Sequence, residues 1–308
     1  MRRRSGPSLL APRQLLDSGS AKQRFASASV YGLPLHRGVG GSRSRGRPIV
    51  AASLDAPHYP ASLVKLMTGM LAWDLMRDPN EAIHVEEGDL RRGSGNNLRH
   101  GDVLTVDEAL HNLLIRSSNT TAQALARHLG RRLAPSGDAV EAFVAEMNKR
   151  AIGMGMSATQ LTDPSGLYDP DMCSSARDVA TLAREAVSYD RLRQILSKTS
   201  HQLQIRGGNE PRVRKVSAPS ACLSIPGVLG GKTGTRRRKP RTFHVVVLLR
   251  TGRRGSVLGV LMGAPDDDAR AADVRTLLEL VGYSPRTWGP GLAGRFGRMA
   301  GGRRPEEA

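Results

Sequence analysis

The sequence predicts an α+β fold: an antiparallel sheet covered by helices, together with an all-helical lobe. Two observations support this prediction. Segments with apolar residues at helical spacing follow one another through the middle of the chain, and the longest strand-like segments come only after them. A doubly wound fold would alternate strand and helix throughout, so that class is not expected. The 308 residues are enough for one large domain with a buried core.

The first 48 residues are expected to be poorly ordered except for a short strand at 27–33, and a further strand is expected at 48–53. Arg, Gly and Ser dominate this segment, and Asp17 is its only acidic residue. The chain begins MRRR, but no apolar stretch of about 7–15 residues follows. The segment is therefore not a convincing signal peptide.

Apolar residues at helical spacing predict a series of helices before the main strands. Thr105 is a candidate cap for the second helix, because an acidic residue, Glu108, stands three positions beyond it. Gly130 is expected to end the third helix. The helices are predicted at 61–76, 105–117, 119–130, 138–155 and 175–188.

Strand composition dominates three segments in the last third of the chain, at 229–235, 242–250 and 256–264. The sequence RTGRRG at 250–255 joins the last two segments and predicts an antiparallel hairpin. A helix predicted at 267–282 is expected to cover one face of the resulting sheet.

The main domain is expected at 49–284, between the N-terminal segment 1–48 and a loose basic tail at 285–308. No run of about 18 apolar residues occurs, so no membrane span is predicted. The tail sequence GLAGRFGRMAGGRR is too rich in glycine to make a good membrane-surface helix.

The charge of the chain is strongly basic. Its formal net charge is +18, from 46 basic and 28 acidic residues. Such an excess would attract nucleic acid, anionic lipid or anionic wall polymers. Aromatic residues make up only 4% of the chain and do not interleave with the basic stretches, so a nucleic-acid function is not expected. The basic run at 236–241 is expected to be a solvated loop, or to attract an anionic wall polymer, a membrane surface or a peptide carboxylate weakly.

The cysteines and histidines do not suggest a metal site. Cys173 and Cys222 lack the spacing of metal ligands, and whether they pair is left open. His58, His100 and His111 are expected to be surface or capping residues. No metal and no cofactor is therefore expected.

Three short motifs stand in order along the chain: SLVK at 62–65, SSN at 117–119 and KTGT at 232–235. Each has a simple structural interpretation when it is taken alone. A lysine on the apolar side of a helix can extend its ammonium group to water, and Asn119 can cap a helix. The sequence KTG is also common in turns and at strand ends. Their combination and order carry more information than any one of them.

The first motif suits nucleophilic catalysis. A helix places Ser62 and Lys65, three residues apart, on the same face. A serine hydroxyl is a poor nucleophile unless a base takes its proton. Burial and neighbouring cations disfavour the charged form of an amine, so Lys65 is a candidate for that base. Ser62 is also expected near a helix N-terminus, where the dipole favours developing negative charge.

Taken together, the motifs resemble those of the D-alanyl-D-alanine carboxypeptidases, the low-molecular-mass penicillin-binding proteins. The resemblance covers about 49–284 and includes the segments AFVAEMNKRAIGMGMSATQLTDPSGLYD and IPGVLGGKTGT. It implies a β-lactamase/transpeptidase-like fold. The implied substrate is a peptidoglycan stem peptide ending in D-Ala-D-Ala, and β-lactam antibiotics are the implied inhibitors. The implied reaction is attack of Ser62 on the terminal peptide bond, followed by hydrolysis of the acyl-enzyme.

The same resemblance implies roles for the other motif residues. Ser117 relays a proton to the leaving amine, and Asn119 orients the substrate amide. Lys232 supplies positive potential near Ser117, and the backbone N–H groups of Ser62 and Thr235 form the oxyanion hole. Two threonine hydroxyls bind the terminal carboxylate. The implied catalytic residues are Ser62, Lys65 and Ser117, and the implied substrate-binding residues are Asn119, Lys232, Thr233, Gly234 and Thr235.

Two alternatives stay open, a serine β-lactamase of the same fold and a non-catalytic wall-binding relative. A class A β-lactamase needs a deacylating Glu with an Asn four residues later, and neither Glu141 nor Glu146 has one. Its second motif would read SDN rather than SSN. For all members of the family the resemblance implies a location outside the cytoplasm, in the periplasm, at the cell wall or on the outer face of the plasma membrane.

Overall fold

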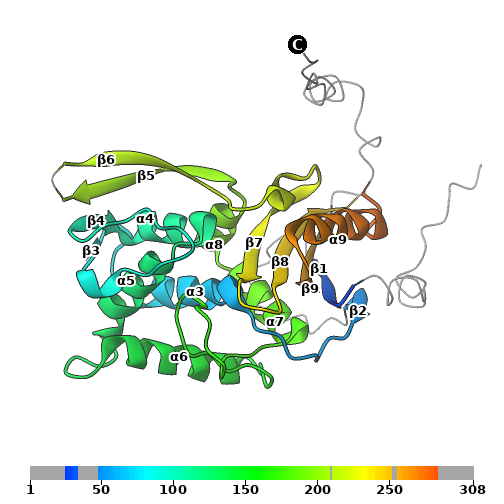
Figure 1. The fold of residues 1–308 in the computed structure, drawn as a ribbon, viewed down its shortest axis with the longest axis horizontal. Coiled ribbons are helices and arrows are strands. Elements are labelled where there is room, and N and C mark those ends of the chain that lie inside the picture. Colours follow the sequence, from blue (N-terminus) through cyan, green and yellow to red (C-terminus); the bar gives the residue numbers. More distant parts are fainter. Residues whose placement is uncertain (1–24, 34–47, 209, 252–254, 284–308) are drawn as a thin grey trace, which may run out of the picture.

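The computed structural model describes residues 25–33, 48–208, 210–251 and 255–283 (Figure 1). The expected loose tail and most of the N-terminal segment lie outside these residues. The described part combines a large antiparallel sheet, shown at the right of Figure 1, with a helical lobe at its left. This arrangement confirms the α+β prediction.

The large sheet has five antiparallel strands in the order β2-β1-β9-β8-β7. The predicted hairpin is confirmed, because Arg250 of β8 pairs with Ser256 of β9. The short strand predicted near the N-terminus is also confirmed, and it pairs with β9 along its whole length. The sheet therefore includes residues before position 49, contrary to the expected division. The strands are β1 (Ser27–Leu33), β2 (Val50–Ala52), β7 (Val228–Arg236), β8 (Thr242–Arg250) and β9 (Ser256–Ala264).

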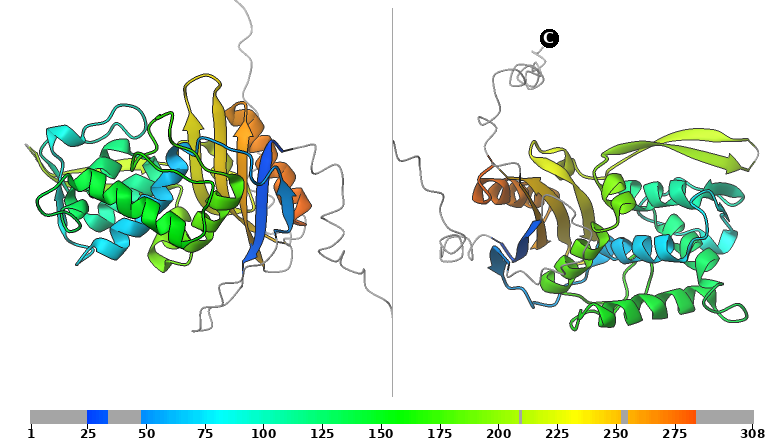
Figure 2. Two further views of the ribbon diagram at one scale, coloured as in Figure 1. Left: turned by 90° about the horizontal axis from the view of Figure 1, so that it is seen from below. Right: turned by 180° about the vertical axis from the view of Figure 1, so that it is seen from behind.

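Helix α9 (Asp267–Leu280) covers one face of this sheet, as predicted, and the helical lobe covers the other (Figure 2). Successive residues of a strand point to opposite faces, and β8 follows this rule. Val245 and Val247 belong to the core cluster that contains α9, whereas Val246 and Leu248 belong to the core of the lobe. Because both faces of β8 are buried, its sequence contains a continuous run of apolar residues.

The lobe is built around α3 (Lys65–Leu75), which is buried along its first eight residues. Four of the predicted helix starts have a side-chain cap, because Thr105, Ser118, Asp138 and Ser175 each accept a hydrogen bond from a backbone N–H one turn later. The other helices are α4 (Val106–His111), α5 (Asn119–Gly130), α6 (Ala139–Gly153), α7 (Ala176–Ala186) and α8 (Asp190–Leu196), with the 3₁₀ turns η1 (Ala61–Val64), η2 (Glu87–Asp89) and η4 (Ala221–Ser224).

The lobe is not all-helical, because it carries a second antiparallel sheet in the order β3-β4-β5-β6. The long β5–β6 hairpin runs along the lobe past α4 and α8 (Figure 1). Most of its side chains are exposed and polar. In β5 the buried Leu203 and Ile205 alternate with exposed polar residues, a short half-buried strand pattern that the sequence-based prediction missed. The strands are β3 (Ala82–His84), β4 (Asp102–Thr105), β5 (Ser200–Gly207) and β6 (Arg212–Ser217).

The second predicted helix is interrupted. It begins as α4 but continues as a π-helical turn, η3 (Asn112–Arg116), which ends at Ser117 in the left-handed conformation. The helix at 61–76 likewise begins with the 3₁₀ turn η1 rather than with a regular α-helical turn. Among the described residues, no helix combines the length and the apolar character needed to cross a bilayer.

Candidate active site

The three motifs meet where the lobe joins the sheet. Ser62 lies in η1, directly before α3, and is half-buried. The residue before it, Ala61, has a positive φ of 50°, which is rare for a residue with a side chain. Gly166, itself at φ 74°, packs against this turn so tightly that a Cβ would lie 2.1 Å from the Ala61 carbonyl oxygen. The strained turn is therefore held in place by a neighbouring loop, as is common for strained backbone at functional sites.

Lys65 is the centre of the site. Its side chain is completely buried, and its Nζ lies 2.9 Å from Ser62 Oγ, 2.9 Å from Asn119 Oδ1 and 2.5 Å from the carbonyl oxygen of Ser165. The amide of Asn119 is oriented by a second bond, which its Nδ2 donates to the carbonyl oxygen of Arg92 at 3.1 Å. An ammonium group has three N–H donors, and all three find an acceptor here.

The two partners of Lys65 other than Ser62 determine what happens when the amine loses a proton. Asn119 Oδ1 and the Ser165 carbonyl can only accept hydrogen bonds, so they take both N–H groups of the neutral amine. The lone pair of the nitrogen is then left facing the Ser62 hydroxyl. This is the arrangement that a general base for Ser62 requires.

The electrostatics favour this neutral form. Burial lowers the pKa of Lys65 to about 7, although the carboxylate of Asp163 opposes the shift. Asp163 does not contact Lys65 directly. Its Oδ1 accepts hydrogen bonds from the backbone N–H groups of Ser165 and Leu167, and so shapes the turn whose carbonyl contacts Lys65. A substantial fraction of Lys65 is neutral at pH 7.

Ser117 faces the second lysine of the site. Lys232 Nζ donates to Ser117 Oγ at 2.8 Å and to the carbonyl oxygen of Thr233 at 2.8 Å. Burial, followed by the nearby charges of Lys65 and Arg270, lowers the pKa of Lys232 well below its usual value. A bound carboxylate would favour the charged form again, so substrate binding and protonation of Lys232 are coupled.

Strand β7 forms one wall of the site. It is the edge strand of the five-stranded sheet, so among the described residues one side of its backbone is not paired with another strand. At Gly234 the strand approaches the serine turn closely, because a Cβ there would lie 2.9 Å from the carbonyl oxygen of Pro60. Thr233 and Thr235 on either side of this glycine line the same cleft as Ser62. A larger residue than glycine would push the strand away from Ser62.

The cleft has a volume of about 300 Å³ and a basic end. Arg270 from α9 is only 3% exposed and donates to the carbonyl oxygens of Gly234 and His244, and it is paired with Asp267. Two exposed arginines of the basic run at 236–241 also line the cleft. The lining residues are Ser62, Ser94, Ser117, Pro219, Thr233, Thr235, Arg237, Arg241, Phe243, Asp267 and Arg270.

The structure thus brings the eight residues singled out from the sequence to one place, either around Lys65 or along the adjoining cleft wall. Asn119 is not a cap, because Ser118 caps α5 instead. Sequence reasoning missed Ser165, which acts through its backbone carbonyl, and Arg270, which lies on a distant helix. The sequence TDPSGL contains the Asp163 turn, and this turn signal could have pointed to the first of them.

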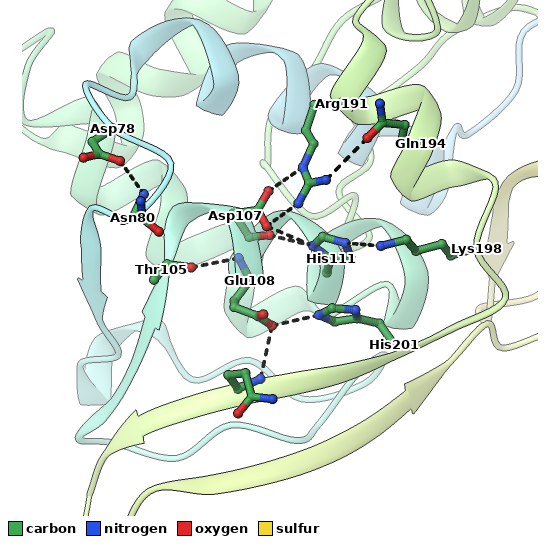
Figure 3. Close-up of polar contacts among 11 residues, drawn as sticks. Asp78, Asn80, Thr105, Asp107, Glu108, His111, Arg191, Gln194, Lys198 and His201 are labelled. Carbon is green, nitrogen blue, oxygen red and sulfur yellow. Dashed lines mark hydrogen bonds and ion pairs between the residues drawn. The ribbon is translucent and has the colours of Figure 1, made fainter.

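One sequence-based expectation about histidines is wrong. His111 is 1% exposed and belongs to a polar cluster between α4, α8 and β5 (Figure 3). Its ring stacks on that of His201 with centroids 3.9 Å apart, and Lys198 Nζ lies 2.9 Å from its Nε2. Glu108 binds His201, and Asp107 binds a neighbouring arginine of α8. Burial lowers the pKa of His111 and so favours the neutral form of the ring.

The other sequence-based expectations concern residues away from the cleft. Cys173 and Cys222 are both free, so the open question of a bridge is answered. In the described part of the chain, no group of His, Cys, Asp and Glu side chains is arranged to hold a metal ion. Arg177 and Asp178 also make local contacts: Arg177 binds Asp55, and Asp178 accepts hydrogen bonds from the 158–159 turn.

Comparison with known proteins agrees with the geometry. Residues 43–264 match the family model described as D-alanyl-D-alanine carboxypeptidase, so the chain belongs to this family. It is 28% identical over 212 residues to D-alanyl-D-alanine carboxypeptidase DacB2 of Mycobacterium tuberculosis, covering 68% of each chain. It is also 28% identical over 247 residues to DacF of Bacillus subtilis, covering 78% of this chain and 60% of that one. Members of the family act on peptidoglycan outside the cytoplasm.

Solved structures show the same fold. The Streptomyces K15 DD-transpeptidase superposes with a TM-score of 0.72 at 19% identity, over 83% of this chain and 96% of that one. A D-alanyl-D-alanine carboxypeptidase from Mycobacterium tuberculosis superposes with a TM-score of 0.67 at 23% identity, over 83% and 90% of the two chains. These matches confirm the predicted transpeptidase-like fold.

Proposed function

We propose that this chain is an active serine D-alanyl-D-alanine carboxypeptidase in which Ser62 is the nucleophile and Lys65 its base. The observation that carries the proposal is the 2.9 Å contact between Ser62 Oγ and the buried Lys65 amine, whose two other partners are acceptors only. Neutral Lys65 takes the hydroxyl proton as Ser62 Oγ attacks the carbonyl carbon of the penultimate D-alanine. The backbone N–H groups of Ser62 and Thr235 stabilise the oxyanion, by about 3–4 kcal/mol for each donor.

The tetrahedral intermediate then collapses to an ester on Ser62 Oγ, and the bond to the terminal D-alanine breaks. The leaving amine needs a proton, which passes from Lys65 through the hydroxyl of Ser117. Lys232 donates to Ser117 Oγ and so orients this hydroxyl for transfer. Water attacks the ester in the second half of the reaction. Lys65 takes a proton from this water and passes it to Ser62 Oγ as the shortened peptide leaves.

The terminal carboxylate of the peptide is proposed to lie beside the hydroxyls of Thr233 and Thr235. Both line the cleft, and Arg270, which also lines it, donates to the carbonyl oxygen of Gly234 between them. Lys232 gains charge when a carboxylate binds, because that carboxylate offsets the effect of burial on its pKa. Asn119 is proposed to orient the substrate amide through its side chain, which also contacts Lys65.

The test is release of D-alanine from a peptide ending in D-Ala-D-Ala. Ser62→Ala is expected to abolish release, whereas Ser224→Ala, an exposed serine outside the cleft, is expected to leave it unchanged. Well-folded protein that releases no D-alanine would contradict the proposal. Rapid and repeated hydrolysis of penicillin would favour a β-lactamase instead. No glutamate lies among the described residues that line the cleft, so the deacylating Glu of class A enzymes has no counterpart there.

We also propose a weak electrostatic contact between the basic loop, residues 236–241, and an anionic wall polymer or membrane surface. Arg237, Arg238, Lys239 and Arg241 are exposed, and the loop contains no acidic residue. Such a contact would hold the cleft near its substrate outside the cytoplasm, at the wall or the outer face of the membrane. Co-sedimentation with isolated cell wall and with phosphatidylglycerol vesicles tests it. Binding that is unchanged by salt, or by replacing all four cations with Gln, would contradict it.

A further inference from the structure

Ser117 stands at the end of an unusual piece of backbone. The π-helical turn η3 is closed by a hydrogen bond that the N–H of Ser117 donates to the carbonyl of Asn112, five residues earlier. The same carbonyl also accepts the N–H of Ser118 at 3.2 Å. Ser117 itself has φ 64° and ψ 38°, a left-handed conformation that costs a residue with a side chain about 1–2 kcal/mol. Such a turn persists only where its surroundings hold it.

Asn112 is held by its own side chain. It is completely buried, and its amide pairs with the amide of Asn97: Asn97 Nδ2 donates to Asn112 Oδ1 at 2.8 Å. Asn112 Nδ2 donates to Thr121 Oγ1 at 2.8 Å and, more weakly, to Asn97 Oδ1 at 3.3 Å. Asn97 is 5% exposed and Thr121 1% exposed. A buried amide is costly unless it is paired, so this cluster has one well-defined arrangement.

The two partners of Asn112 belong to the two elements that frame the SSN motif. Thr121 lies in the first turn of α5, the helix that begins at Asn119. Asn97 lies in the loop that folds over this motif, where the carbonyl of Ser94 accepts the N–H of Asn119 at 3.0 Å. In the same loop, a Cβ at Gly95 would lie 2.4 Å from Ser118 Cα. The loop and α5 are therefore both fixed against the π-helical turn.

We infer that Asn112, clamped through its side-chain amide, is a positioning residue for the turn that carries Ser117 and Asn119. It contacts neither the cleft nor Lys65. Its carbonyl fixes the backbone of Ser117, and its amide ties that backbone to the loop and to α5. The effect on the reaction is indirect: the Ser117 hydroxyl stays within reach of Lys232 for proton transfer. This inference rests on the proposed carboxypeptidase function.

The experiment compares kcat and KM for D-alanine release, and the rate of acylation by benzylpenicillin, among folded variants. Asn112→Leu removes the amide but keeps a similar shape, and Thr121→Val removes only the hydroxyl that receives the bond. Both are expected to lower kcat and the acylation rate, by about tenfold or more for Asn112→Leu, with KM nearly unchanged. Thr121→Ser keeps a hydroxyl and is expected to restore the rate.

Asp89→Asn is the matched control. It weakens the contact of the buried Asp89 with Arg127, which lies nearly two turns beyond Thr121 in the same helix, α5. It is expected to lower thermal stability while kcat stays at the wild-type value. Should Asn112→Leu not fold, the isosteric Thr121→Val, compared with Thr121→Ser, still distinguishes positioning from general stability.

Two results would overturn the inference while the proposed function stands. One is an active wild type with kcat unchanged in Asn112→Leu and in Thr121→Val. The other is a loss of kcat in Asp89→Asn as large as that in Asn112→Leu, which would show a general effect of stability. A wild type that neither releases D-alanine nor reacts with penicillin would overturn the proposed function itself, and with it any role for Asn112 in positioning.

Discussion

Replacing Lys65 with Met should change how the stability of the protein depends on pH. The pKa of Lys65 falls from 10.5 to about 7 on folding, because burial disfavours the ammonium form. Between these values the unfolded chain binds a proton that the folded protein does not bind, so the free energy of unfolding rises with pH. For these two pKa values the rise from pH 7 to about pH 9 is about 2 kcal/mol.

Lys65→Met lacks this contribution, so the difference in unfolding free energy between the two proteins should shift by about 2 kcal/mol over that range, in favour of the wild type at the higher pH. The size of the difference at one pH is less informative, because the variant also leaves Asn119 Oδ1 and the Ser165 carbonyl unpaired. Urea unfolding at several pH values measures the shift. Lys149→Met, at a lysine whose side chain is 77% exposed, is the control and should show none. A pH-independent difference for Lys65→Met would refute a buried, largely neutral amine.

Three further outcomes follow from the site. The rate of acylation by penicillin should rise with pH through about 7 as Lys65 loses its proton, and a flat profile would exclude it as the base. Gly166→Ala should slow acylation and lower the free energy of unfolding by about 1–3 kcal/mol, because its Cβ would meet the Ala61 carbonyl. Gly153→Ala is the control and should do neither, because a Cβ at Gly153 would have open space around it. Arg270→Gln should weaken the preference for a free peptide carboxylate over a C-terminal amide, and an undiminished preference would argue against its role.

The parts of the fold that the sequence predicts well are those in which burial is regular. Strands β8 and β9 are buried on both faces, and their apolar runs predict their bounds as observed. The β5–β6 hairpin was not predicted, because its position depends on contacts of a few residues, such as Leu203 and Ile205, with the lobe. The π-helical turn continues the apolar run of the predicted helix, and it differs from an α-helix in the bond from the Ser117 N–H to the Asn112 carbonyl, five residues earlier.

The active site likewise combines contacts between residues close in sequence, which can be predicted, with contacts between distant segments, which cannot. The spacing of Ser62 and Lys65 predicts that they meet, since a helical turn guarantees it. The TDPSGL turn signal marks the loop of Ser165, but this loop lies one hundred residues away in the chain, and only the structure shows that its carbonyl contacts Lys65. Arg270 likewise reaches the cleft only because α9 packs against the sheet beside β7 and β8. Backbone acceptors and residues from distant elements can be assigned to the site only from the structure.

The most direct test of the nucleophile is the intact mass of the protein after incubation with benzylpenicillin, measured beside Ser62→Ala. We expect one stoichiometric penicilloyl adduct on the wild type and none on the variant, because the lactam is attacked as the D-Ala-D-Ala bond would be. An unmodified wild type that unfolds cooperatively would contradict the assignment of Ser62 and would favour a non-catalytic wall-binding relative. An adduct that persists in Ser62→Ala would place the reactive group elsewhere.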